Sequence, residues 1–304
     1  MKTPVVIDVH EHALKARAAW ASIASNATLI VFKLIVGVLS GSIGIISEAL
    51  HSGSDLVASI ISLVAVRASA KPADPSHRYG HEKVENISGV IEGLLIIAAA
   101  VVIVYEAVQK IIHGPHIEHL ELAVGVMLVS AGANLLISRG VLSPVAKRTD
   151  SAALEADAAH LLTDVYTSGG IAFGLVLVKV TGWEYFDPIL AIAVALLIVW
   201  TGWGLVDHST RVLLDEALPD DELELIGEKV AEHRGELIIG FHRLRSRKAG
   251  SKRLIDLHIT VPDDMTVDEA HGVAEHIEAD IVELLPNSEA LVHVEPRSHR
   301  PESD

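Results

Sequence analysis

Two histidine–aspartate pairs with the same spacing lie in long apolar stretches of the chain. His51 precedes Asp55 by four residues, and His160 precedes Asp164 by four. Residues four apart lie on one face of a helix, so each helix would present one imidazole and one carboxylate to a common point. Four nitrogen and oxygen ligands from two helices make a tetrahedral site that suits a divalent cation, zinc first. The spacing therefore predicts a metal site between two helices.

An interhelical hydrogen-bond network is the alternative interpretation of these pairs. A charged side chain at the centre of a bilayer costs about 2.5–3.5 kcal/mol on insertion scales. Two pairs of identical type and spacing on separate membrane helices therefore need a compensating partner. A bound cation supplies one, and we favour the metal interpretation.

The composition indicates a membrane protein. The chain has 304 residues, of which 50% are hydrophobic and 21% are charged, and its mean hydropathy is +0.41. It contains no cysteine, so a metal would be bound by histidine, carboxylate or backbone oxygen. The 17 histidines favour a metal-related function. Residues 1–18 are polar, so we expect no cleavable signal sequence and assign them to a cytoplasmic N-terminal segment.

Six apolar stretches are long enough to cross about 30 Å of hydrocarbon. They are residues 20–39, 43–66, 84–112, 120–137, 154–180 and 185–206, within a transmembrane domain expected over residues 19–208. Ten basic residues flank these stretches on the side of the N-terminus, and two flank them on the other side. Because basic loops stay in the cytoplasm, we expect an integral, multi-pass protein of the cell or inner membrane with both termini cytoplasmic.

A third domain is expected over residues 209–304, where the hydropathy falls and acidic residues dominate. From Asp215 onward there are 22 acidic and 10 basic residues. The pattern predicts a helix after Pro219, strands at 236–244 and 254–261 joined by a turn at 245–252, a second helix that residues 263–266 cap and that reaches about Leu284, and a strand at 290–294. This αββαβ order predicts a small α+β, ferredoxin-like domain. A domain with so many acidic residues is not suited to binding nucleic acid, which is itself negatively charged.

Several motifs, taken together with the two pairs, resemble one family. These stretches are residues 47–52, 71–74, 77–83 and 214–219. The chain resembles the cation diffusion facilitator family of proton-coupled exporters of zinc and related divalent metals. The resemblance implies a six-helix bundle that carries a cytoplasmic domain through which two protomers associate as a homodimer.

Two further metal sites follow from this resemblance. In the loop after the second apolar stretch, one turn could gather the ligands Asp74, His77 and His81. Some family members bind metal at such a loop. In the acidic domain, the resemblance implies a zinc pair on His242, His258, His271, His293 and Glu295. The family would place aspartate where this chain has Glu295. The alternative for both sets is solvated surface histidines.

The remaining histidines receive weaker interpretations. We interpret His113, His116 and His119 as polar loop residues rather than an outer metal site, and we assign no function to His208, His233, His276 and His299. Lys83 and Asp215 match a charge pair that, in the family, joins the helix bundle to the cytoplasmic domain.

These observations predict proton-coupled efflux of Zn²⁺ by alternating access, with the lipid bilayer, divalent metal ions and protons as partners. The same ligands leave iron(II), cadmium, cobalt and manganese open as cargo. A membrane metal sensor or channel is a second class of function, although conduction requires weak binding. We expect no enzymatic activity, because the chain has no His-Glu-x-x-His helix for a metallohydrolase.

Overall fold

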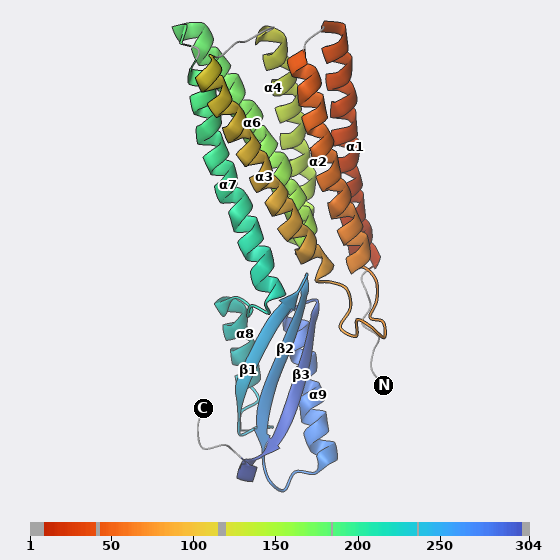
Figure 1. Ribbon diagram of the computed structural model, residues 1–304. Coiled ribbons are helices and arrows are strands. Elements are labelled where there is room, and N and C mark those ends of the chain that lie inside the picture. Colours follow the sequence, from red (N-terminus) through yellow and green to blue (C-terminus); the bar gives the residue numbers. More distant parts are fainter. Residues whose placement is uncertain (1–8, 41–42, 115–119, 184, 236, 300–304) are drawn as a thin grey trace. The chain divides into compact units, whose positions relative to one another are not determined.

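The computed structural model describes residues 9–40, 43–114, 120–183, 185–235 and 237–299, and it divides into two compact units. The first ends at Thr210 and the second begins at Arg211. The helices of the first unit are α1 Val9–Ser40, α2 Ile43–Ser69, α3 Val84–His113, α4 Leu120–Ile137, α5 Ser143–Thr149, α6 Ala152–Thr181 and α7 Phe186–Leu213, whose last three residues belong to the second unit (Figure 1). A π-helical turn at Ser138–Leu142 joins α4 to α5.

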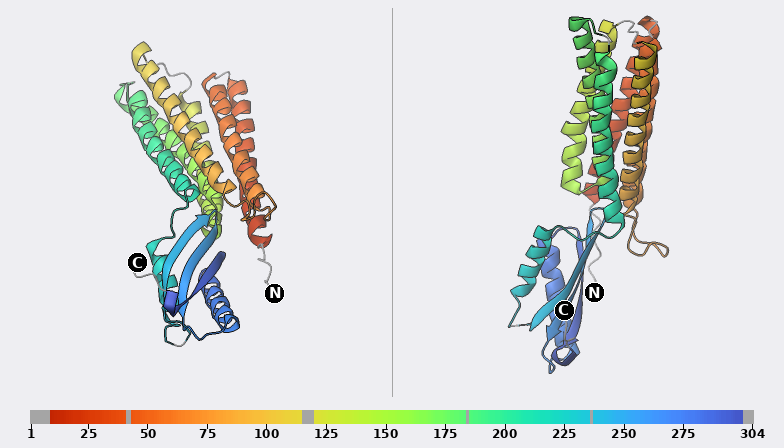
Figure 2. Two further views of the ribbon diagram at one scale, coloured as in Figure 1. Left: turned by 60° about the horizontal axis from the view of Figure 1, so that its bottom comes forward. Right: turned by 60° about the vertical axis from the view of Figure 1, so that its left-hand side comes forward.

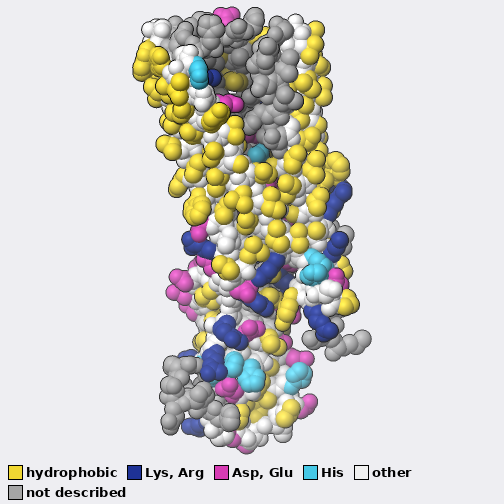
Figure 3. Space-filling view, viewed as in Figure 1, with side chains coloured by type: hydrophobic (Ala, Val, Ile, Leu, Met, Phe, Trp, Pro, Cys, Tyr) yellow, Lys and Arg dark blue, Asp and Glu magenta, His cyan; other side chains and the backbone are white. Residues whose placement is uncertain are grey.

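All six expected membrane helices are present, and apolar side chains cover much of the visible face of this bundle (Figure 3). Four described stretches are long and apolar enough to cross a membrane: Glu11–Leu39, Val84–His113, Val124–Thr149 and Pro188–Leu213. Two boundaries differ from the expectation. α1 begins at Val9, and residues 139–149, which lie between the fourth and fifth expected stretches, continue the fourth helix through the π turn and α5.

Small residues let the membrane helices approach closely. A Cβ atom on Gly93 of α3 would lie 2.7 Å from Cγ2 of Val206 and 3.0 Å from the carbonyl oxygen of Gly202, both on α7. Ile96 and Ile198 pack beside this crossing in one buried cluster. Contact of this kind replaces the hydrophobic driving force that lipid cannot supply.

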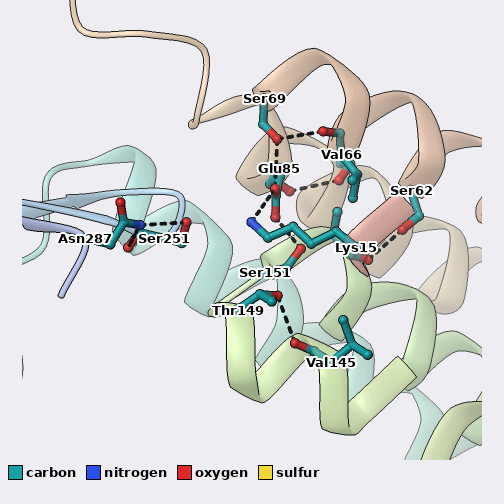
Figure 4. Close-up of polar contacts among 12 residues, drawn as sticks. Lys15, Ser62, Val66, Ser69, Glu85, Val145, Thr149, Ser151, Ser251 and Asn287 are labelled. Atoms are coloured by element: carbon teal, nitrogen blue, oxygen red, sulfur yellow. Dashed lines mark hydrogen bonds and ion pairs between the residues drawn. The ribbon is translucent and has the colours of Figure 1, made fainter. Parts of the chain in front are cut away.

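A buried polar cluster joins one end of four helices (Figure 4). Glu85, at the start of α3, accepts hydrogen bonds from Lys15 of α1 at 3.1 Å and from Ser69 at the end of α2 at 2.8 Å. Ser151, directly before α6, donates to its other carboxylate oxygen. All four side chains are buried, so this carboxylate connects the helix ends at a position closed to solvent.

The second unit has the expected αββαβ order: α8 Asp220–Ala231, β1 Gly240–Ala249, β2 Lys252–Val261, α9 Val267–Leu284 and β3 Ser288–Pro296. β1 pairs with β2 antiparallel and β2 with β3 parallel. Both helices cover one face of the sheet (Figures 1 and 2). Their apolar side chains and those of Leu257 and Ile259 form its core.

The expected position of the hairpin turn at 245–252 is wrong. The charged residues from Arg245 to Lys248 belong to β1, and the turn is formed by Gly250 and Ser251. Gly250 adopts φ +59°, a conformation that glycine tolerates and that a tight turn requires. Strand residues alternate between faces, so Arg245 and Arg247 share one face of the strand, where their side chains are 73% and 38% exposed. The expected start of α9 is confirmed, because Thr266 and Glu269 form a capping box.

Candidate metal centres

The membrane pairs lie on α2 and α6, which pack against each other. His160 is 5% exposed, and Asp164, one turn further along α6, is half-buried. Asn134 of α4 donates to Asp164 Oδ2 at 3.4 Å. The side chains of His51 and Asp55 lie outside the described residues. Two of the four predicted ligands are therefore placed inside the bundle, and the four-ligand set stays a prediction.

Asp157 is a buried acid on the same face of α6, three residues before His160. Its Oδ1 accepts a hydrogen bond of 3.0 Å from Ser59 of α2. Ser59 in turn contacts Ser22 at 2.9 Å and accepts from Asn26 at 2.8 Å, both on α1. Sequence reasoning missed this network. Its signal was the spacing of Asp157 and His160, which places two ionisable residues one turn apart.

Two more charged residues lie inside the bundle. Glu92 of α3 is fully buried, and neither of its carboxylate oxygens has a hydrogen-bond partner among the residues that the structure describes. Lys33 of α1 is 4% exposed and donates to Ser52 of α2 at 2.6 Å. Ionisable groups at such positions mark functional pathways in membrane proteins.

The loop between α2 and α3 brings its three predicted ligands together. Asp74 Oδ1 lies 3.4 Å from His77 Nδ1, and Asp74 Oδ2 lies 3.4 Å from His81 Nε2. Backbone N–H groups of Ser76 and His77 donate to Asp74 at 2.8 and 2.7 Å. The hydrogen bond from His77 is the largest cause that holds the pKa of Asp74 below its usual value, and the bond from Ser76 acts in the same direction. Nδ1 of His81 contacts the Lys71 carbonyl at 3.3 Å, which orients Nε2 toward Asp74.

Three histidines form a row across the sheet of the second unit. The register pairs His242 of β1 with His258 of β2, and His258 with His293 of β3. The ring centroids are 5.4 and 4.7 Å apart. Because His258 alternates with the core residues Leu257 and Ile259, this row lies on the face away from α8 and α9. A β-bulge directly after His242, where Arg243 adopts φ +52°, interrupts the pairing of β1 with β2 beside the row, and the pairing resumes at Arg245.

Glu295 is the common neighbour of the three histidines. Its Oε1 lies 2.7 Å from His258 Nδ1 and 3.8 Å from His293 Nε2, and its Oε2 lies 3.3 Å from His242 Nε2. The hydrogen bond with His258 is the main cause that holds the pKa of Glu295 below its usual value, against the opposing effect of burial. Glu295 therefore offers an ionised carboxylate at neutral pH.

The donors of this row fit a zinc ion. His242 Nε2 and Glu295 Oε2 are buried, and neither has a hydrogen-bond partner among the described residues. Ligand atoms of a tetrahedral zinc with bonds of about 2.0–2.1 Å lie about 3.3 Å apart, and these two atoms are 3.3 Å apart. The nitrogen and oxygen atoms are thus at ligand spacing before any ion binds.

Other predicted residues lie apart from these groups. His271 is exposed on α9, 3.3 Å from Glu275, and does not join the His242–His258–Glu295 cluster. His113 Nδ1 contacts the Gln109 carbonyl at 3.0 Å, and His116 and His119 lie outside the described residues. Asp215 pairs with Arg247 at 3.4 Å. Lys83 belongs to the other unit, so its pairing with Asp215 stays a prediction.

Comparison with known proteins covers both units. Residues 19–214 match a family model described as the cation efflux transmembrane domain, and residues 218–297 match the cation efflux protein cytoplasmic domain. An uncharacterized transporter of Synechocystis sp., sll1263, is 34% identical over 279 residues, which cover 91% of this chain and 89% of the relative. The cation-efflux pump FieF of Escherichia fergusonii is 30% identical over 285 residues, 94% of each chain. The zinc form of CzrB, a protein proposed to be a zinc transporter, is 34% identical, with a TM-score of 0.27 over 29% of this chain and 99% of that one.

The helical unit, its buried ionisable residues and these matches define an integral membrane protein of the cation efflux class. The chain belongs to the cation diffusion facilitator family, whose members are transporters. Its second unit is the cytoplasmic domain of that family.

Proposed function

We propose that this protein exports Zn²⁺ in exchange for protons, through a site formed by His51, Asp55, His160 and Asp164. The observation that carries the proposal is the pair on α6: His160 is 5% exposed, and the half-buried Asp164 follows one turn later in an apolar bundle. Two imidazoles and two carboxylates suit tetrahedral zinc. Iron(II), cadmium, cobalt and manganese are the alternative cargoes of the same ligands.

Proton exchange follows from the chemistry of the ligands. Zinc binds the neutral imidazole, so a proton and the metal compete for the same nitrogen atom. An imidazole with a pKa of about 6.5 exchanges its proton near physiological pH. When the site faces a neutral cytoplasm, the metal binds. When the site faces a more acidic exterior, protons displace the metal. The protonated site then turns back to face the cytoplasm.

The cytoplasmic domain supplies the regulatory part of the proposal. Zinc at the histidine row joins β1, β2 and β3 through Glu295, so binding stabilises this domain when cytoplasmic zinc rises. We propose that two protomers associate through these domains and that zinc binding there favours the transporting state. The loop ligands Asp74, His77 and His81 form a further, exposed zinc site that export does not require.

A flux assay tests transport and separates it from the other classes of function. Full-length protein in liposomes should show saturable zinc flux that a pH gradient drives. Asp164→Asn should abolish this flux because one of four ligands is lost, whereas Asp150→Asn, outside the site, should retain it. Size-exclusion chromatography checks that both variants fold. Zinc flux of Asp164→Asn close to wild type would refute the site. Electrical current without saturation would indicate a channel, and zinc binding without any flux a sensor.

A further inference from the structure

The cytoplasmic domain brings together a second group of possible ligands, on its helical side. His233 follows the C-terminus of α8, and His276 and Asp280 lie one turn apart on α9. One ligand atom from each of the three lies within 4.8 Å of the others. The histidine row faces away from both helices, so the two groups lie on opposite sides of the sheet.

His233 is held in place by its backbone. Its N–H donates to the Val230 carbonyl at 3.2 Å, and its own carbonyl accepts from Leu237 and Ile238 at 3.1 and 3.2 Å. Gly235, with φ +86°, closes the same turn. Three hydrogen bonds on one residue fix its backbone and the direction of its Cα–Cβ bond, and the contact with Asp280 orients the ring.

The imidazole of His233 is already aligned with a carboxylate. His233 Nε2 lies 2.8 Å from Asp280 Oδ2, and the two side chains are only 13% and 18% exposed. The ring of His276 meets the ring of His233 edge-on, with centroids 5.2 Å apart. His276 is exposed, so its ring can turn toward Asp280 and leave the fourth position open to water.

One cation already lies near this group and would compete with a metal. Lys229 Nζ is 3.8 Å from Asp280 Oδ2, but it is 2.9 Å from Glu232 Oε2. The shorter contact with Glu232 is the first cause that raises the pKa of Lys229. Lys229 therefore has a closer partner elsewhere and is not needed to satisfy Asp280, which has His233.

We propose that His233, His276 and Asp280 bind a divalent transition metal, Zn²⁺ first, with water as the fourth ligand. Two imidazoles and one carboxylate form the donor set of an open tetrahedral site, and such donors select zinc, cobalt, nickel or copper over magnesium and calcium. The ion ties the end of α8 to α9 and so fixes the helical layer of the domain. This site is independent of transport, and Asp164→Asn retains it.

Metal counting on the full-length protein tests the proposal. Wild type, His276→Gln, Asp280→Asn and His208→Gln are dialysed against the free Zn²⁺ concentration that fills the histidine row, and bound zinc is measured per protomer. His208 is exposed on α7 and is the matched control. We expect His208→Gln to equal wild type and the other two variants to bind one zinc fewer. Equal zinc counts in all four proteins would overturn the site.

A second measurement separates metal binding from a purely structural hydrogen bond. His276→Gln leaves the contact between His233 and Asp280 intact, so without metal its melting temperature should equal that of wild type. With Co²⁺, wild type should show more absorption from tetrahedral cobalt than His276→Gln. If the cobalt spectra of the two proteins coincide, the group is a hydrogen-bonded pair and not a metal site.

Discussion

Lys15 Nζ and Glu85 Oε1 form an ion pair of 3.1 Å in which the two side chains are 1% and 0% exposed. Lys15 lies on α1, and Glu85 starts α3. The carboxylate also accepts from Ser69 and Ser151. Both charges are thus removed from solvent and compensated only inside the bundle. In such a pair, removing one charged side chain lowers the stability of the protein far more than replacing both.

Lys15→Met should therefore lower the free energy of unfolding by about 3–5 kcal/mol, because Glu85 would remain buried with an uncompensated charge. The double variant Lys15→Met/Glu85→Gln should recover part of this loss. Thermal unfolding of both variants in detergent, followed by circular dichroism, measures the difference. A double variant less stable than Lys15→Met would contradict this account.

A second ion pair predicts acid sensitivity of the cytoplasmic domain. Arg253 donates to both carboxylate oxygens of Glu222, at 2.8 and 2.7 Å. These bonds hold the pKa of Glu222 below 4.5 in the folded domain. As the pH falls, Glu222 therefore takes up a proton more readily in the unfolded chain than in the folded domain. The stabilisation is fully present above about pH 4.5 and is lost as the pH falls through the lower, folded pKa.

Glu222→Gln should lower the stability of the cytoplasmic domain by about 1–2 kcal/mol at neutral pH and reduce its loss between neutral and acidic pH. Denaturant unfolding at several pH values measures both effects. Glu224→Gln, an exposed position on the same helix, is the control and should behave as wild type. Parallel pH profiles for wild type and Glu222→Gln would show that this pair does not contribute.

Zinc binding at the histidine row should weaken as the pH falls from about 7.5 to 6, because protons compete with zinc for the imidazole nitrogen atoms and histidine side chains in general exchange protons near this range. The lowered pKa of Glu295 leaves its carboxylate ionised throughout this range. The histidines therefore account for the competing protons. Glu295→Gln should weaken zinc binding at every pH without changing the slope. Chelator competition measures the affinity, and an affinity that does not vary with pH would exclude histidine ligands.

His51→Asp tests the choice of metal. The substitution replaces a neutral nitrogen donor with a flexible anion and adds one negative charge to the proposed transport site. Preference for zinc over the larger cadmium ion should fall, while transport continues. Competitive flux of the two metals in liposomes measures the ratio. An unchanged ratio would show that helix packing, and not this ligand, sets the selectivity.

Local patterns were enough to predict the order of elements. The capping residues Thr266 and Glu269 mark the start of α9, and the apolar runs mark the membrane helices. The hairpin position was wrong because the charges from Arg245 to Lys248 were interpreted as a loop, whereas a strand with one exposed face accommodates them. Periodicity within one segment carries no information on pairing between segments.

The same limit applies to the candidate sites. The spacing of Asp74, His77 and His81 predicts their proximity, because all three lie in one short loop. His233 and Asp280 are far apart in sequence, and only the packing of α8 on α9 brings them to 2.8 Å. Asp157 and Glu92 were missed for a similar reason, since burial and missing hydrogen-bond partners are properties of the folded bundle.

The parallel pairing of β2 with β3 has a consequence for biosynthesis. β3 joins the sheet only after α9 has crossed from the far end of β2, and β3 carries both His293 and Glu295. A ribosome-bound chain that has reached only β2 carries His242 and His258 without their shared carboxylate. The ligand set of the histidine row is therefore complete only after α9 and β3 have been synthesised and β3 has paired with β2.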